Sequence, residues 1–352
     1  MFEKVSSVRN SNLELLRIVA MMGIILSHYH FFLGELMEAN PTSLMSIYHY
    51  SIGMGGKIGI NVFMLITGYF MCTKEISAAK FVRLLAQIYF YCILIQGLFM
   101  IMGAISVNRY SVLDMLFPFY MLHMDCFIAD FMWFYLFIPF VRILIENITR
   151  KQHFILILLS LIVFIGYNTL PGFYTQVNPI TWFIVLMFIA SYVRLYNPRC
   201  LQVSFLKMGG VTLFLIICAI ISIVILVRMG KFPRVFFAEA NSILGFSIAF
   251  SLFITFLNLK IGFNKYINLY GGAAFGVLLI HSNCWPMREL IFKDIIDTQQ
   301  NFLIGNWWAP LFACPAIYFV CGTMEIIRKN TIEQPILNVL YTILKIEKQL
   351  LI

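Results

Sequence analysis

Long apolar runs separated by short polar connections make up most of the chain. Each run lies near the roughly 20 residues that a helix needs to cross a lipid bilayer. We predict spans at about 13–33, 54–72, 82–105, 127–146, 153–170, 180–196, 211–228, 241–259, 271–291 and 304–327. The pattern therefore indicates an all-α integral membrane protein with about ten transmembrane helices.

Two stretches do not fit the span pattern. The segment 110–125 is apolar but contains Asp114, Pro118 and Asp125, so we expect an interfacial or re-entrant segment. The tail 331–352 mixes apolar residues with Lys and Glu, which favours a short amphipathic helix at the cytoplasmic surface. No polar linker separates the rest, and we interpret residues 1–330 as one membrane domain.

The Lys and Arg residues set the expected orientation. With the N-terminus inside, cytoplasmic segments hold 18 of the 25 Lys and Arg residues, as the positive-inside bias requires. We therefore expect both termini in the cytoplasm. One outward connection is unusually basic, with Arg228, Lys231 and Arg234; either the span count differs there or this loop attracts an anionic ligand.

Composition excludes several other classes of protein. Hydrophobic residues make up 61% of the chain and charged residues 12%, against about 25% charged in soluble domains. The net charge of +9 is spread between apolar runs, so we do not expect nucleic-acid binding. The eight cysteines are scattered without a Cys-x-x-Cys pair or metal-ligand spacing, which indicates free thiols and no metal.

The first run carries polar side chains where lipid-facing sequence should be uncharged. Arg17 and His28 are eleven positions apart, about 16 Å along nearly the same face of a helix. Glu14 lies close to that face, and His30 points away from it. Because a charge facing lipid is costly, we expect this helix to line a functional cavity.

The same residues resemble the acyltransferase-3 family of membrane acyltransferases. Arg17 and His28, with ten residues between them, resemble the signature of its first membrane helix. The segments Asn12-Leu-Glu-Leu-Leu-Arg17-Ile-Val-Ala20 and Gly59-Ile-Asn-Val-Phe-Met-Leu-Ile-Thr-Gly-Tyr69-Phe70 resemble its first two motifs. Further similarities, in the family's order, are Lys80-Phe-Val-Arg83, Trp133-Phe-Tyr-Leu-Phe-Ile-Pro139 and Leu278-Leu-Ile-His281.

The resemblance implies the transfer of an acyl group, usually acetyl from acetyl-CoA, to a hydroxyl of a cell-surface carbohydrate or its lipid-linked precursor. It also implies a bacterial plasma membrane as the setting. His28 matches the family's proposed catalytic residue, and a neutral imidazole can take a proton from an attacking hydroxyl. The alternative is a histidine that only bonds to a neighbouring helix.

Basic residues near the cytoplasmic ends of the spans are the candidate donor site. Arg17 can bind a phosphate or simply extend toward the interface, and Glu14 can pair with it. Lys80 and Arg83 lie on one helix face and resemble the family's basic pair, attributed to the acyl-donor region. That pair is usually two arginines, so Lys80 departs from the pattern, and both residues also fit the ordinary positive-inside bias.

Three further candidates fall in the outward half of their spans, as His28 does. Asn61 replaces a residue that is often acidic in the family motif, so a charge-based role there is in doubt. His281 can assist proton transfer, bind the acceptor or be satisfied within the core. Trp133 can anchor its helix at the interface or stack against a sugar ring.

A second hypothesis from another class is a transporter or flippase of saccharide or lipid-linked intermediates, with Arg17 and His28 along the substrate path. The sequence shows neither internal symmetry nor a matched pair of broken helices. A polysaccharide polymerase would need long outward loops with several Arg residues, and only 228–239 comes near that.

Overall fold

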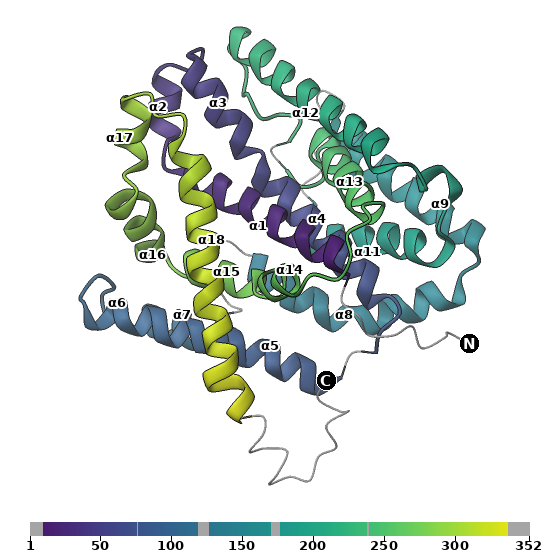
Figure 1. Ribbon diagram of the computed structural model, residues 1–352, viewed down its shortest axis with the longest axis horizontal. Helices are drawn as coiled ribbons and strands as arrows, with labels where there is room; N and C mark the ends of the chain where they lie inside the picture. The colour runs from purple at the N-terminus through teal and green to yellow at the C-terminus, as the bar shows by residue number, and fades with distance from the viewer. Residues whose placement is uncertain (1–9, 76, 119–126, 170–176, 238, 337–352) are drawn as a thin grey trace.

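The structure is a computed structural model that describes residues 10–75, 77–118, 127–169, 177–237 and 239–336. The described residues form helices and connections and contain no strand. The all-α prediction is therefore confirmed for this part of the chain. Figure 1 shows the helices as one bundle, with α1 (Ser11–Phe31) near its middle.

In the part of the chain that the structure describes, seven helices or continuous helical stretches are long and apolar enough to cross a membrane. They confirm the membrane character and correspond to seven of the predicted spans. In chain order they are α1, α3–α4 (Leu44–Gly53 and Gly55–Met71), α5 with η1 and α6 (Ala78–Tyr91, Cys92–Gln96, Gly97–Ile101), α8 (Phe127–Asn147), α11 (Pro179–Tyr196), α12 (Phe205–Arg228) and α18 with η5 (Ala309–Arg328, Lys329–Glu333).

The other three predicted spans have different forms. The 153–170 run is the helical stretch α9, η2 and α10 (Arg150–Leu161, Ile162–Gly166, Tyr167–Thr169), and 241–259 is the shorter helix α13 (Ile243–Leu257). The 271–291 run is not one helix. It is divided among α14 (Lys265–Gly271), α15 (Ala274–His281), α16 (Trp285–Glu289) and the start of η4 (Leu290–Ile295).

Short elements fill the connections. They are α2 (Gly34–Ala39), α7 (Arg109–Leu116), η3 (Arg199–Leu201) and α17 (Thr298–Leu303). Helix α7 begins the segment predicted to be interfacial, and 119–126 lies outside the described residues. Residues 331–336 continue the helix of α18, whereas the rest of the predicted amphipathic tail, 337–352, also lies outside them.

Helix α1 is the element around which the bundle is arranged. It packs against α3, α4, α13, α14, α15 and α18. Its closest neighbour is α4, because small residues line the contact: a Cβ on Gly59 would lie 2.5 Å from the carbonyl oxygen of Ala20, and one on Gly55 would lie 2.7 Å from that of Gly23. Small residues let two membrane helices approach backbone to backbone.

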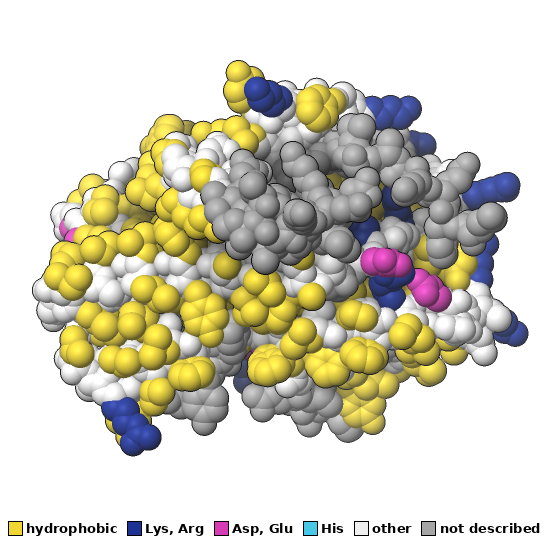
Figure 2. Space-filling model, turned by 90° about the horizontal axis from the view of Figure 1, so that it is seen from below, with side chains coloured by type: hydrophobic (Ala, Val, Ile, Leu, Met, Phe, Trp, Pro, Cys, Tyr) yellow, Lys and Arg dark blue, Asp and Glu magenta, His cyan; other side chains and the backbone are white. Residues whose placement is uncertain are grey.

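The outer surface is largely apolar. Figure 2 shows hydrophobic side chains over most of the described part of one face, with most of the visible Lys and Arg side chains toward its right-hand edge. On α12, for example, Leu213, Phe214 and Ile221 are all at least half exposed. A surface of this kind suits contact with lipid rather than water.

Candidate active site

The structure brings two of the predicted site residues into direct contact. His28 on α1 and His281 at the end of α15 lie with Nδ1 of His28 3.0 Å from Nε2 of His281. His281 is fully buried, while His28 is partly exposed. The contact therefore joins a buried imidazole to a partly exposed one.

A second hydrogen bond settles which nitrogen carries the proton. Nδ1 of His281 lies 2.7 Å from the carbonyl oxygen of Val277, and a carbonyl only accepts, so this Nδ1 is the protonated nitrogen. In the neutral ring, Nε2 of His281 then has a lone pair and accepts from Nδ1–H of His28. Neutral His28 consequently has its own lone pair on Nε2, the nitrogen that can take a proton.

A break in the backbone holds His281 at this position. Helix α15 ends at His281, and residues 282–284 separate it from α16. Asn283 bonds back through Nδ2 to the carbonyl oxygen of Leu279 at 2.9 Å, and the buried Arg288 donates through Nε to Ser282 Oγ at 3.1 Å. Arg288 was not predicted as a site residue. It lies close to this break, which could not be recognised as long as 271–291 was expected to be one continuous helix.

At the other end of α1, Arg17 and Glu14 form an ion pair. Arg17 donates through Nη1 to Glu14 Oε1 at 2.9 Å, with side-chain exposures of 25% and 6%. The guanidinium also lies over the ring of Phe70, 5.7 Å from its centroid. The side chain of Glu14 is enclosed by α14, because a Cβ on Gly271 would lie 2.7 Å from its Oε2. Arg17 therefore keeps an exposed portion beside a buried carboxylate.

The start of α5 positions the other two basic candidates. Ser77 caps this helix by accepting from the backbone N–H of Lys80, so Lys80 and Arg83 lie in its first two turns. Both side chains are partly exposed. Arg83 Nε lies 3.7 Å from Glu333 Oε1 in η5. None of the contacts recorded for Arg17 involves Lys80 or Arg83, so the structure does not join the three directly.

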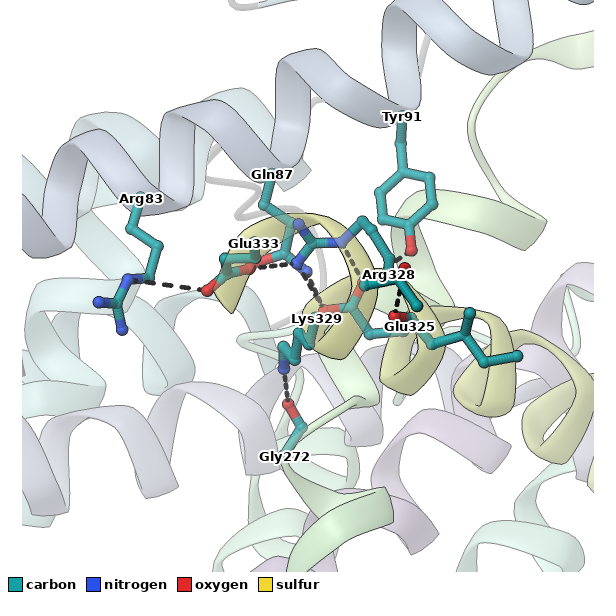
Figure 3. A network of polar contacts seen from close by, with 10 residues as sticks. Arg83, Gln87, Tyr91, Gly272, Glu325, Arg328, Lys329 and Glu333 are labelled. Atoms are coloured by element: carbon teal, nitrogen blue, oxygen red, sulfur yellow. Dashed lines mark hydrogen bonds and ion pairs between the residues drawn. The ribbon is translucent and has the colours of Figure 1, made fainter. Parts of the chain in front are cut away.

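A buried polar network between α5 and α18 was missed by the sequence analysis (Figure 3). Its centre is the fully buried Glu325, which accepts from Tyr91 Oη at 2.6 Å and from Gln87 Nε2 at 3.0 Å. Arg328 donates to both carboxylate oxygens of Glu325, at 2.8 and 3.0 Å. The sequence does contain an indication of this network. Glu325 lies near the end of one apolar run, and the helix that faces it has polar residues at every fourth position, Arg83, Gln87 and Tyr91.

Asn61 and Trp133 lie in different surroundings. Asn61 is buried and links three segments: its Oδ1 accepts from Trp182 Nε1 at 2.8 Å, and its Nδ2 donates to the carbonyl oxygen of Ala240 at 2.6 Å. Trp133 is 48% exposed on α8.

In the part of the chain that is described, no group of three or more His, Cys, Asp or Glu side chains could hold a metal ion.

A comparison with family models identifies the family of the chain. Residues 10–325 match the family model described as an acyltransferase domain, the acyltransferase-3 model. Searches of curated proteins and of solved structures found no match. The matched range contains α1, α4, α5 and α15 and so includes both histidines of the pair. Because the match extends over most of a chain built from membrane-length helices, the protein belongs to the acyltransferase-3 family and is a membrane acyltransferase.

Proposed function

We propose that the protein transfers an acetyl group from acetyl-CoA to a hydroxyl of a bacterial cell-surface polysaccharide or its lipid-linked precursor, with His28 as general base. The observation that supports this most strongly is the bonded pair of His28 and His281, since its tautomers leave a basic nitrogen on His28. The family match supports the acyltransferase and gives no support to the transporter hypothesis.

The proposed chemistry is direct transfer. The acceptor hydroxyl loses its proton to Nε2 of His28 as its oxygen attacks the thioester carbonyl carbon. The C–S bond then breaks, and the protonated His28 returns the proton to the departing thiolate. His281 is a positioning residue, because its Nε2 accepts from Nδ1–H of His28 and stabilises the imidazolium that forms.

The donor would approach from the cytoplasmic side. Arg17, Lys80 and Arg83 are the proposed phosphate ligands, as each has a partly exposed cationic side chain near the predicted inner ends of α1 and α5. His28 lies about 16 Å farther along α1 than Arg17, within reach of an extended thioester arm. Glu14 supports this site by orienting Arg17.

The acceptor would approach from the outward side of the plasma membrane. Asn61 is proposed to support this side by fixing the 239–242 connection onto α4 through Ala240. Trp133, half exposed on α8, either anchors that helix at the interface or stacks against a sugar ring.

Purified protein in detergent, radiolabelled acetyl-CoA and a surface-glycan fraction test the proposal. We expect label transfer by the wild type and a loss of about a hundredfold or more in His28→Ala, since general base catalysis contributes at least that much. His30→Ala is the matched control, because His30 is on the same helix but packs against Tyr50 instead. Full transfer by His28→Ala would refute the role of His28, and acceptor translocation without CoA would favour a transporter.

A further inference from the structure

The polar network between α5 and α18 extends from the protein interior to its surface. Arg83, Gln87 and Tyr91 follow one another at every fourth position of α5, on one helix face. Glu325, Arg328 and Glu333 lie opposite them, as Figure 3 shows. Side-chain exposure rises steadily along the network: 0% for Glu325, 7% for Arg328, 19% for Glu333 and 34% for Arg83.

The inner half of this network has its own anion. Glu325 pairs with Arg328 through both carboxylate oxygens and also lies 3.2 Å from Lys329 Nζ. Lys329 donates in addition to the carbonyl oxygen of Gly272 at 2.8 Å. Glu325 therefore pairs with Arg328 through its own two oxygens, and Glu333 takes no part in those contacts.

Glu333 nevertheless lies between two arginines. Its Oε2 accepts from Arg328 Nη2 at 2.6 Å, and its Oε1 lies 3.7 Å from Arg83 Nε. Two guanidinium groups around one partly exposed carboxylate form an arrangement that suits a phosphate equally well. Arg328 and Glu333 both lie beyond the residues that the family model matches.

We propose that Glu333 occupies the place of an acyl-donor phosphate between Arg83 and Arg328, and that the donor must displace it in order to bind. This inference rests on the proposed function, since it assigns a competing anion and one further ligand, Arg328, to the proposed donor site. Displacement requires the side chain of Glu333 to leave Arg83 and Arg328. The carboxylate of Glu333 thereby sets the affinity for the donor.

Binding of unacylated CoA to the purified full-length protein in detergent tests this inference separately from catalysis. Removing the competing charge in Glu333→Gln should tighten CoA binding about tenfold, measured by calorimetry at constant ionic strength. Glu333→Ala should do the same and guards against a folding defect in one variant. Glu146→Gln is the matched control, because Glu146 pairs with Arg142 at another predicted cytoplasmic end and its loss should leave the affinity unchanged.

A phosphate-free probe identifies which part of the donor competes with Glu333. Acetyl-pantetheine, which lacks phosphates, should bind wild type and Glu333→Gln equally. Unchanged or weaker CoA binding by both Glu333 variants, while the wild type binds CoA, would overturn the inference and leave the proposed function standing. Absence of CoA binding by the wild type and both variants would overturn the proposed donor and the inference together.

Discussion

Two hydrogen bonds determine which nitrogen of a neutral His28 ring can accept a proton. Val277 accepts from Nδ1–H of His281, and with both rings neutral this bond places the proton of His28 on Nδ1. If neutral His281 instead carried its proton on Nε2, it would donate to Nδ1 of His28. The neutral His28 ring would then carry its own proton on Nε2 and have no lone pair there. In the proposed mechanism, the lone pair on Nε2 of His28 thus depends on the backbone carbonyl of Val277.

Replacing His281 tests this positioning role. We expect His281→Ala to lower kcat about a hundredfold through misorientation of His28, with little change in KM for the donor. His281→Gln should restore part of the activity, because its side-chain oxygen can accept from Nδ1–H of His28. Equal activity of the two variants, with a pH–rate profile like that of the wild type, would show that His281 only fills space.

The buried carboxylate of Glu325 gives a second prediction at this scale. Glu325→Ala would leave the buried guanidinium of Arg328 with the partly exposed Glu333 as its remaining carboxylate, which should cost about 3 kcal/mol of stability. The exposed pair of Arg142 and Glu146 provides the comparison, since Glu146→Ala should cost about 1 kcal/mol or less. Thermal unfolding in detergent measures both, and equal effects would mean that the buried pair is not an organising contact.

At the scale of helices, close packing of α1 on α4 fixes the position of His28 in the bundle. Gly55 and Gly59 bring the two backbones together, and Ser27, one residue before His28, lies against Gly56. Helix α15 makes close contacts near both of its ends. Gly276 packs on Glu325, whose Cγ leaves no room for a Cβ at this position, while His281 at the other end contacts His28.

A side chain at Gly59 should disturb this packing. Gly59→Val would force α1 and α4 apart at Ala20, costing about 1–3 kcal/mol as overpacking does, and should lower activity by shifting His28. Gly97→Ala is the control, because nothing lies within 4 Å of a Cβ at that position. An unfolding temperature for Gly59→Val equal to that of Gly97→Ala would contradict the close contact.

The helices were predictable from sequence to different extents. The run at 13–33 is mostly apolar, contains no proline and follows a capping residue, Asn10, so its helix is close to the expected one. The run at 271–291 is equally apolar, yet its backbone breaks after Gly271 and after His281, and hydropathy carries no information on such breaks. The contact of His28 with His281 joins residues 253 positions apart, which no local spacing can reveal.

At the scale of the whole molecule, the distribution of charge and the proposed direction of catalysis belong together. The predicted inner ends of α1, α5 and α18 carry Arg17, Lys80, Arg83 and Arg328, and the histidine pair lies farther along the bundle. With this orientation, a donor entering from the cytoplasm meets cations first and the base afterwards. The opposite orientation would place the same cations toward the acceptor.

Labelling of cysteines in intact cells tests the orientation. Cys200 is exposed in the connection between α11 and α12, which we expect in the cytoplasm, and Thr42 is exposed between α2 and α3 on the expected outward side. A membrane-impermeant maleimide should label Thr42→Cys in a Cys200→Ser background without permeabilisation, and native Cys200 only after it. The reverse result would invert the proposed topology.

The most direct test of the whole account is an experimental structure with a non-reactive acetyl-CoA analogue bound. We predict that the CoA phosphates lie against Arg17, Lys80 and Arg83. We also predict that the thioester mimic lies close enough to His28 to be attacked by an acceptor hydroxyl that is hydrogen-bonded to Nε2 of His28. Phosphates bound far from these three residues, His28 facing lipid, or solid packing between the phosphate site and His28 would contradict it.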